Sequence, residues 1–582
     1  MINISNGSIK FDLQDYKGNV FLIEIIKQNN VIFSHKMENT TKFELPFDEL
    51  KFENVPLTGN FSVRLLNLYG DYADLLDETD LYLEPMERSY PRADYGHIVG
   101  TNYTPAFAVN QIHFFTCYTD YRPEIKKELE CASKIGMNSL RIYLHNKPFE
   151  DDKISFMKNL EYLIEDCSQV NIKPLFIFFD DCWHGEEEIV YEFEPIDGMH
   201  NGRWAKCPLF SQRKLSCYPL FYNYITDIIS KYRNDNRIFA WEIWNEPKNL
   251  GMPGKFDVEF TNDLMCNSYH WARMINPKQP IISCWSGNRW GDVDNVHNYC
   301  TIDSAQEYNG NVGCFVDVRR GTLVTEAGCR KWKDQAYGSP VDWISWLTKR
   351  KEKGFENPGV FLNWELMVGN SNCTWHWSSQ LNDMRPPIPW CGFFFPDLTP
   401  VSYTEITAIR RYTGKPYNII IFHGFDNAEE IATLEKKGSF EVISTGSCGE
   451  LVSSDATEST LSFSSNISDN FILQVAVCIS NEAKAAISLQ SDDKASSITL
   501  TEKSLSCKSE NHFLSCDIDS YDNIYQNIKI IRESGKLRVF LNDMSVQKIE
   551  SDTGSEPLRL SLHAWGHVRF DDLSIISKDW EG

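Results

Sequence analysis

The sequence predicts a multi-domain chain of α/β plus all-β class, in which a central (β/α)₈ barrel is flanked by an N-terminal and a C-terminal β-sandwich. Two observations support this prediction. At 582 residues the chain is too long for a single hydrophobic core. Its middle alternates apolar strand-like runs with helical patterns, whereas both ends carry only strand and turn patterns. We place the three domains at residues 1–88, 89–415 and 416–582.

The first segment contains short apolar runs separated by turns, at residues 20–26, 31–33 and 61–66. Spaced runs of this kind are typical of a small Ig-like β-sandwich. In the last segment, two alternating runs meet at Glu533-Ser534-Gly535, which predicts a hairpin. The last segment as a whole indicates a jelly-roll or lectin-like sandwich.

Eight strands with intervening helices are expected in the middle segment. Helical patterns occur, for example, at residues 122–135 and 156–170. Eight strands in this alternation match a (β/α)₈ barrel with long loops. The strands are expected at residues 97–103, 138–144, 173–180, 238–245, 280–286, 293–299, 322–326 and 359–364.

Composition restricts the classes of partner. The hydrophobic share of 42% and the charged share of 24% are those of an ordinary globular protein. No apolar run approaches the roughly 20 residues that cross a bilayer. The net charge of −24 argues against nucleic-acid binding, which depends on clustered Lys and Arg. We therefore expect neither a nucleic acid nor a membrane as partner, and the oligomeric state stays open.

Two further features concern the cellular compartment. The 17 cysteines include no CxxC pair, and several lie in apolar runs, which is typical of reduced structural thiols. The segment from Met1 to Lys10 lacks the basic and apolar regions of a secretory signal. We expect a cytoplasmic protein, or a secreted one whose leader has been removed.

Two of the expected barrel strands end in glutamate. One apolar run ends at Glu246, and the following Pro247 cannot continue a sheet ladder. The other run ends at Glu326, just before a glycine. The C-terminal ends of barrel strands meet at one face, and a retaining glycosidase needs two carboxyl groups about 5–5.5 Å apart. A single strand-end glutamate can equally cap a helix or pair with an arginine, so the prediction depends on the pair.

The motifs Trp244-Asn245-Glu246-Pro247 and Thr325-Glu326-Ala327-Gly328 resemble those of the clan of retaining (β/α)₈ β-glycosidases that includes glycoside hydrolase family 5, the cellulase and mannanase family. The resemblance covers the barrel and neither sandwich. It implies hydrolysis of a β-linked oligosaccharide or polysaccharide by double displacement. It further implies that Glu246 is the acid/base, that Glu326 is the nucleophile, and that no metal or other cofactor takes part.

Other strands extend the resemblance. Arg141 matches the second-strand arginine that supports the nucleophile, and His297 and Tyr299 match the sixth-strand pair. Trp364 matches the eighth-strand tryptophan under the bound sugar. Purely structural roles stay open for each: an ion pair for Arg141, and core packing for His297 and Trp364.

The third strand departs from the family pattern. The family usually has a histidine there, whereas this chain reads Phe178-Phe179-Asp180-Asp181-Cys182-Trp183-His184. We expect the acidic pair to contact sugar hydroxyls, with His184 as a substitute from the loop. Further candidate sugar contacts are Asp181, Trp183 and His184 here, His145 after the second strand and Glu365 after the eighth. Purely structural roles stay open for Asp181, His145 and Glu365.

Fourteen of the sixteen tryptophans fall between Trp183 and Trp390. Many follow an expected strand, and in a barrel these loops form the rim of the active site. Long insertions after the third and eighth strands could wall off the cleft, which favours short substrates and cleavage at chain ends. Candidates for stacking on sugar are Trp183, Trp204, Trp285, Trp290, Trp375, Trp377 and Trp390.

The environments predict the roles. Arg141 beside Glu326 should lower the pKa of that carboxyl, whereas surrounding rings should raise the pKa of Glu246, as a general acid requires. Asn245 is expected to hydrogen-bond the sugar 2-hydroxyl. The alternative is a non-catalytic carbohydrate-binding protein on the same barrel. A metal-dependent hydrolase would need clustered ligands, yet the thirteen histidines include no His-x-His or HExxH.

Overall fold

A computed structural model describes most of the 582 residues. The residues outside the description are 6, 19, 87–97, 248–257, 284–289, 300–321, 333–337, 353–359, 380–386, 416–418, 446–447, 468–469, 481, 493, 510–511, 519–521, 550–557 and 579–582. Trp285 and the predicted boundary near residue 88 lie outside the described residues. The predicted boundary near residue 415 falls between the helix α11 (Tyr403–Thr413) and the strand β18 (Ile419–His423).

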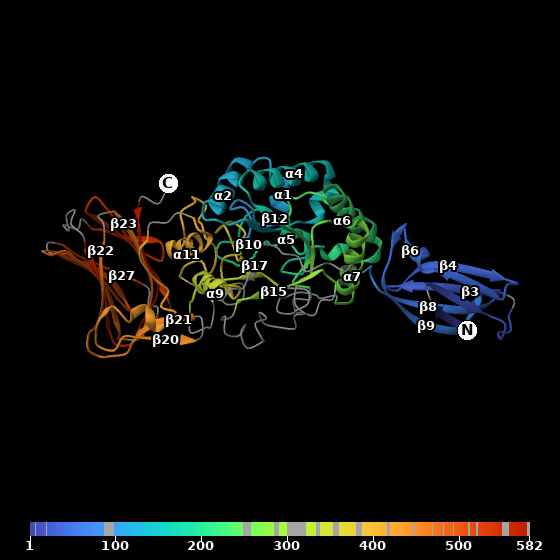
Figure 1. Ribbon diagram of the computed structural model, residues 1–582. Helices are drawn as coiled ribbons and strands as arrows, with labels where there is room; N and C mark the ends of the chain where they lie inside the picture. Colours follow the sequence, from blue (N-terminus) through green and yellow to red (C-terminus); the bar gives the residue numbers. More distant parts are fainter. Residues whose placement is uncertain are drawn as a thin grey trace.

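Eight parallel strands close into a barrel at the centre of the molecule (Figure 1). The strands follow one another around the barrel in chain order, and the first pairs with the last. Each overlaps one of the eight ranges expected from the sequence. They are β10 (Ile98–Asn102), β11 (Ser139–Tyr143), β12 (Lys173–Asp180), β13 (Ala240–Asn245), β14 (Ile281–Ser283), β15 (Val293–Asn298), β16 (Thr322–Ala327) and β17 (Val360–Asn363).

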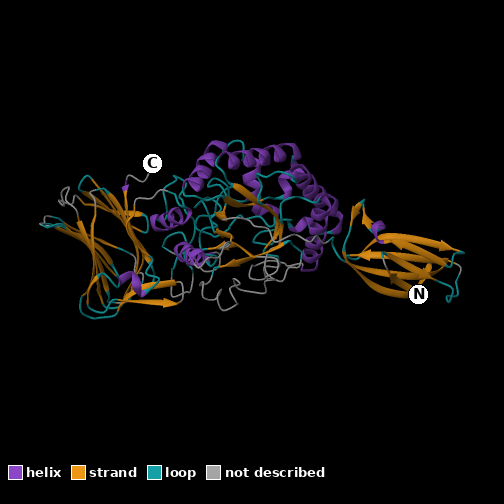
Figure 2. Ribbon diagram, viewed as in Figure 1, coloured by secondary structure: helices purple, strands orange, loops and turns teal. Residues whose placement is uncertain are grey.

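Burial on both faces explains why these strands read as continuous apolar runs. In β12 every residue after Lys173 is buried. Helix α4 (Lys153–Gln169) packs against β12, so this strand has no solvent face to alternate with the core. Figure 2 shows the helices around the barrel. They include α1 (Gln111–Cys117), α2 (Arg122–Lys134), α3 (Asn146–Asp151), α4, α6 (Tyr218–Tyr232), α7 (Val258–Ile275), α9 (Pro340–Glu352) and α11, whereas α5 (Glu187–Val190) lies in the loop after β12.

The helix ends follow ordinary capping chemistry. In α4 the buried residues Phe156, Leu160, Leu163 and Cys167 recur at helical spacing, and the Asp152 carboxylate accepts from the backbone N–H of Ser155 at the N-terminus. Helix α11 ends at Gly414, whose φ of +71° is the left-handed conformation that glycine adopts without a Cβ clash.

The N-terminal segment forms two main antiparallel sheets whose inner faces share a core with the barrel helices. A three-stranded sheet contains β1 (Ile2–Ser5), β2 (Ser8–Asp12) and β5 (Lys42–Pro46). A four-stranded sheet contains β4 (Asn30–Glu38), β3 (Val20–Lys27), β8 (Gly59–Tyr69) and β9 (Tyr72–Leu83). The short pair β6 (Lys51–Phe52) and β7 (Val55–Pro56) lies beside α6.

The C-terminal segment forms two large antiparallel sheets with one hydrophobic core between them. The predicted hairpin is present: Glu533 pairs with Lys536, and Ser534 and Gly535 form its turn with positive φ. One sheet contains β18, β20 (Glu441–Thr445), β21 (Cys448–Ser453), β32 (Val568–Ser577), β23 (Phe471–Ile479), β28 (Gln526–Glu533), β29 (Lys536–Leu541) and β30 (Met544–Ile549). The other contains β19 (Glu435–Lys437), β22 (Ser459–Ile467), β31 (Leu558–Trp565), β24 (Lys484–Gln490), β25 (Ala495–Thr501), β26 (Ser504–Lys508) and β27 (Phe513–Asp517).

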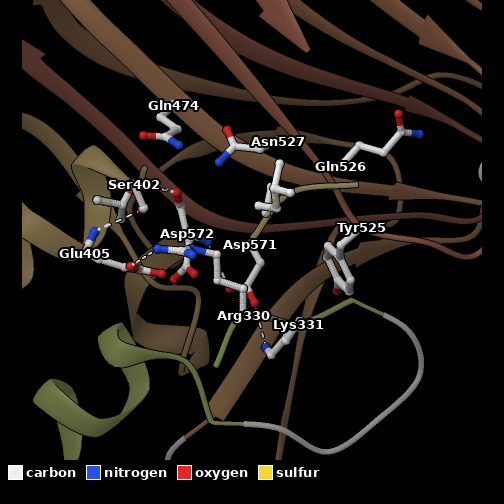
Figure 3. Close-up of a pocket in the computed structure, with 13 residues that line it drawn as sticks. Arg330, Lys331, Ser402, Glu405, Gln474, Tyr525, Gln526, Asn527, Asp571 and Asp572 are labelled. Carbon is white, nitrogen blue, oxygen red and sulfur yellow. Dashed lines mark hydrogen bonds and ion pairs between the residues drawn. The ribbon is translucent and has the colours of Figure 1, made fainter. Parts of the chain in front are cut away.

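Both outer units are attached to the barrel by polar contacts of buried side chains. On the N-terminal side, Lys27 Nζ lies 2.5 Å from Asp263 Oδ1 on α7. On the C-terminal side, Lys331 pairs with Asp571 at 2.6 Å, next to the pair of Arg330 and Glu405 that also spans 2.6 Å (Figure 3). These contacts, and the core that the N-terminal sheets share with the barrel helices, hold the outer units against the barrel. No helix among the described residues combines the length and apolar character needed to cross a membrane.

Candidate active site

Glu246 and Glu326 meet at the C-terminal end of the barrel strands. Glu246 follows β13 directly with a φ of +42°, and Glu326 lies in β16. An oxygen of each carboxyl group lies within 4.8 Å of the other. The Glu246 side chain is 13% exposed and that of Glu326 is 6% exposed, so both reach a recess rather than open solvent.

The Glu326 carboxylate is surrounded by hydrogen-bond donors. Arg141 Nη1 and the Tyr143 hydroxyl each donate to Oε1 at 2.6 Å, and the Tyr299 hydroxyl donates to Oε2 at 2.6 Å. Burial, reinforced by the nearby Glu326 charge, raises the pKa of Tyr143 and of Tyr299 well above its usual value. Both phenols therefore remain protonated, and all three donors stabilise Glu326 as an anion.

Arg141 holds this arrangement in place from inside the barrel. Its guanidinium is fully buried and forms a two-point ion pair with Glu242, at 2.8 and 2.7 Å. Its Nη2 also donates to Asn245 Oδ1 at 2.7 Å. Burial alone would lower the pKa of Arg141, but its acidic neighbours raise it well above the usual value, so the residue stays charged.

Glu246 has different neighbours. His297 Nδ1 lies 2.7 Å from Glu246 Oε1 and 3.2 Å from Glu326 Oε2, so one ring nitrogen faces both carboxyl groups. The Cys182 thiol donates to Glu246 Oε2 at 3.2 Å, and burial raises the pKa of that thiol well above its usual value. A thiol kept neutral in this way acts as a weak donor rather than as a nucleophile.

Both glutamates line a cavity of about 330 Å³ with mainly aromatic walls. This volume is near the lower end of the roughly 300–1,000 Å³ typical of small-molecule sites. Aromatic faces with a few polar groups suit sugar rings, which present apolar faces and hydroxyl edges. The lining residues are Tyr143, Cys182, Trp183, His200, Asn201, Trp204, Asn245, Glu246, Tyr299, Glu326, Trp364, Trp377 and Trp390.

Asp180 organises one side of this cavity. Its Oδ1 accepts from Asn245 Nδ2 and from the backbone N–H of Cys182, both at 2.9 Å, and its Oδ2 accepts from Trp204 Nε1 at 2.7 Å. Burial raises the pKa of Asp180 to about 6, although the donors Asn245 and Trp204 act in the opposite direction. Asp180 therefore contacts three cavity-lining residues, and its oxygens are already occupied by protein donors.

Several residues predicted to contact sugar do not line this cavity. Asp181 instead pairs with Arg213 at 2.5 Å and accepts from Thr261 at 3.0 Å, because its side chain points toward α7 rather than inward. Glu365 accepts from the backbone N–H groups of Thr104 and Leu366, and burial raises its pKa to about 8. Both carboxyl groups therefore already accept from protein donors, and the sugar contacts expected of them stay predictions.

The candidate histidines His184 and His145, which follow the third and second strands, are also not among the residues that line this cavity. His184 pairs through its backbone with Trp204 and Lys206 and does not line the cavity. His145 accepts from the Lys147 N–H at the start of α3, and its Nε2 lies 3.1 Å from the Lys206 carbonyl. Burial lowers the pKa of His145 to about 3, so its ring is neutral.

The tryptophan candidates divide into two groups. Trp183, Trp204, Trp377 and Trp390 line the cavity, as does the predicted platform Trp364. Trp290 and Trp375 are not among its lining residues. Tyr299 stacks on Trp390 with ring centroids 5.6 Å apart and an interplanar angle of 23°.

The sequence also contained residues whose position was not foreseen. Tyr143 follows Arg141 by two residues on β11, and that spacing places both on one face of a strand. Glu242 is a charge inside an apolar run, which signals a buried partner. His200 and Asn201 lie in a long loop, where no pattern marked them.

One group of three described side chains could in principle hold a metal ion: Glu246, His297 and Glu326. The donor set does not favour this. Both oxygens of Glu326 already accept from Arg141, Tyr143 and Tyr299, and a cation would have to compete with the adjacent guanidinium. Among the described residues, this group therefore suits a hydrogen-bonded pair of carboxyl groups better than a metal ion.

Comparisons with known proteins add little beyond this geometry. No family model and no curated protein matches the chain. Among solved structures, the chain is similar to a family 39 glycoside hydrolase from Bacteroides cellulosilyticus, with 14% identity over 91% of this chain and 98% of that one and a TM-score of 0.32. It is also similar to a galectin-like protein of unknown function from Bacillus subtilis, with 8% identity over 28% of this chain and 96% of that one and a TM-score of 0.25. A carbohydrate-binding module, CBM66, from the same organism shares 16% identity over 25% of this chain and 97% of that one, with a TM-score of 0.20. TM-scores of this size carry no argument, and the resemblance to family 5 stays a prediction.

Proposed function

We propose that the chain is a retaining glycoside hydrolase that cleaves a β-linked glycan by double displacement. The observation that supports this most directly is the approach of the Glu246 and Glu326 carboxyl oxygens to within 4.8 Å across an aromatic cavity. Retaining enzymes hold their carboxyl pair about 5–5.5 Å apart, whereas inverting enzymes need roughly 6.5–9.5 Å to admit a water.

The environments assign the two roles. Glu326 is the nucleophile, because Arg141 and two tyrosines stabilise its anion and align it. Glu246 is the acid/base, because it is the more exposed of the pair and contacts weaker partners, His297 and Cys182. It carries the proton that the leaving group requires.

The reaction has two steps. First, Glu246 donates its proton to the glycosidic oxygen while a Glu326 oxygen bonds to the anomeric carbon, and the bond to the leaving group breaks. Second, Glu246 takes a proton from a water that attacks the same carbon, and the bond to Glu326 breaks. Two inversions at one carbon give net retention.

Asn245 is suited to hold the sugar 2-hydroxyl. Arg141 and Asp180 fix its amide, and the second Nδ2 hydrogen has only a weak contact with Cys182 Sγ at 3.6 Å, which a hydroxyl can replace. A contact of this kind strengthens in the transition state and contributes several kcal/mol in such reactions.

The test is a panel of 4-nitrophenyl β-glycosides followed by proton NMR of the first-formed sugar. We expect turnover of at least one glycoside and initial release of the β-anomer. Release of the α-anomer would exclude double displacement. Sugar binding by calorimetry without turnover of any glycoside would favour the alternative, a non-catalytic carbohydrate-binding protein.

A further inference from the structure

Two long loops above the barrel are joined across the cavity. The loop after β12 and the loop after β17 are linked by Asn372 Nδ2, which donates to the Ile196 carbonyl at 2.8 Å. They are linked again where the His200 backbone N–H donates to Ser379 Oγ at 2.8 Å. His200 Nδ1 also lies 2.5 Å from the Trp375 carbonyl, and burial lowers the pKa of His200 to about 3, so the ring is neutral and donates from Nδ1.

The loop after β10 completes this connection. Asn110 Nδ2 donates to the carbonyls of Val190 and Arg203, at 2.8 and 2.7 Å, on the β12 loop. The Asn370 backbone N–H donates to the Ala106 carbonyl at 2.8 Å, and a Cβ at the neighbouring Gly369 would lie 2.6 Å from Ala106 Cα. Each of the three loops therefore bonds to both of the others, and we call them together the three-loop wall.

The three-loop wall borders the cavity beside both glutamates. At the start of the β12 loop the Cys182 thiol donates to Glu246. Tyr143, whose hydroxyl donates to Glu326, packs edge-on against Trp204 of the β12 loop with ring centroids 5.0 Å apart. It packs in the same way against Trp364, which follows β17, at 6.1 Å. The sugar ring whose carbon bonds to Glu326 must lie against these rings, because all three line the cavity and Tyr143 contacts the nucleophile.

We infer that the site accepts only the terminal, non-reducing unit of a glycan and releases it as a monosaccharide; this inference rests on the proposed function. A further sugar on the non-reducing side would have to pass through backbone and side-chain hydrogen bonds of the three-loop wall. The leaving group lies toward Glu246, which protonates it. The cavity of about 330 Å³ is small enough to suit one bound unit rather than several.

The test compares 4-nitrophenyl β-glycosides of one sugar with the corresponding β-1,3- and β-1,4-linked disaccharide glycosides, using the full-length chain. Direct release of nitrophenol from a disaccharide glycoside needs room for a second unit beyond the bound one. We expect kcat/KM for direct release to be at least tenfold higher with the monosaccharide glycoside. Equal or higher values with a disaccharide glycoside would overturn the inference and leave the hydrolase intact. Absence of turnover with every glycoside would overturn the proposed function itself.

A pair of variants tests the three-loop wall directly. Asn372→Ala combined with Ser379→Ala removes two links between the β12 and β17 loops, whereas Ser378→Ala changes a neighbouring serine that contacts His376 within its own loop. In the double variant we expect the ratio of kcat/KM for the monosaccharide glycoside to kcat/KM for the disaccharide glycoside to fall at least threefold. In the control variant we expect this ratio to stay unchanged. Thermal melting checks that both remain folded. An unchanged preference in a folded double variant would show that these links do not limit the substrate.

Discussion

Arg141 donates from Nη1 to Glu326 Oε1 at 2.6 Å while the same guanidinium forms a two-point pair with Glu242. One fixed cation therefore serves two carboxylates with different tasks. Glu242 compensates the charge of Arg141 in the barrel interior, whereas Glu326 faces the cavity. Because Arg141 cannot lose its proton, the nucleophile keeps an opposite charge beside it at every working pH.

Replacing Glu326 with Gln should abolish turnover. Gln keeps the shape, and its single carbonyl oxygen can still accept from Arg141 and Tyr143. Its amide nitrogen cannot accept from Tyr299, and the side chain cannot form the covalent intermediate. We expect kcat for 4-nitrophenyl glycosides to fall roughly 10⁴-fold or more, as for the loss of other covalent nucleophiles. Steady-state kinetics measures the loss, and circular dichroism checks the fold. Near-normal turnover in this variant would remove Glu326 from its role.

Replacing Glu246 with Ala should slow the reaction by an amount that depends on the leaving group of the substrate. Substrates with poor leaving groups need the proton, so their rate of glycosylation should fall roughly 10²–10⁴-fold. For dinitrophenyl glycosides, whose leaving group departs without protonation, the rate of glycosylation should fall much less. Added azide can replace the water that Glu246 would activate, so it should restore turnover and yield a β-glycosyl azide. Equal losses for good and poor leaving groups would contradict the assignment of Glu246 as the acid.

Replacing Arg141 with Met should destabilise the fold strongly. The change leaves Glu242 and Glu326 buried without their cation, and breaking a buried pair typically costs about 3–5 kcal/mol. The control is Arg64→Met, because Arg64 pairs with Glu78 on the surface and should contribute about 1 kcal/mol or less. Urea unfolding measures both free energies. Similar losses in the two variants would mean that the Arg141 pairs contribute little net stability.

Glu365 should make stability depend on pH. Burial raises its pKa from 4.5 to about 8, so the folded state binds the proton more tightly than the unfolded state. This contribution is fully present below pH 4.5 and is lost as pH rises toward about 8. The Gln side chain of the Glu365→Gln variant cannot ionise, so the variant should not lose stability at this position as pH rises.

The stability of Glu365→Gln relative to the parent should therefore rise between pH 5 and pH 9, by an amount on the order of a few kcal/mol. Urea unfolding at both pH values gives this difference, and the surface variant Glu38→Gln should show almost none. A Glu365→Gln difference that is the same at both pH values would mean that the parent carboxyl ionises as easily in the fold as in the unfolded chain.

Much of the barrel could be predicted because its signals are local. Apolar runs such as 173–180 are strands that are buried on both faces, and residues such as Pro247 mark where a run must stop. The convergence of Glu246 and Glu326 followed from the same rule, since parallel strands of a closed barrel end at one face.

Local sequence patterns did not predict which way each side chain points. Glu242 and Asn245 are three residues apart on β13, yet both contact Arg141, so strict alternation of faces breaks between them. Asp180 and Asp181 point to opposite sides, as alternation requires, but only the structure shows that it is Asp180 that contacts the cavity residues. Adjacent acidic residues look equivalent in sequence because their difference depends on which distant side chain each one meets.

The sequence by itself determined the strands, the pair of glutamates and the arginine beside them, because each of these depends on short-range patterns of burial and chain termination. Only the tertiary structure decided which tryptophans line the cavity and that the loops carrying His200 and Ser379 join over it. Loop contacts of this kind depend on packing between residues far apart in the chain, for which no local pattern exists.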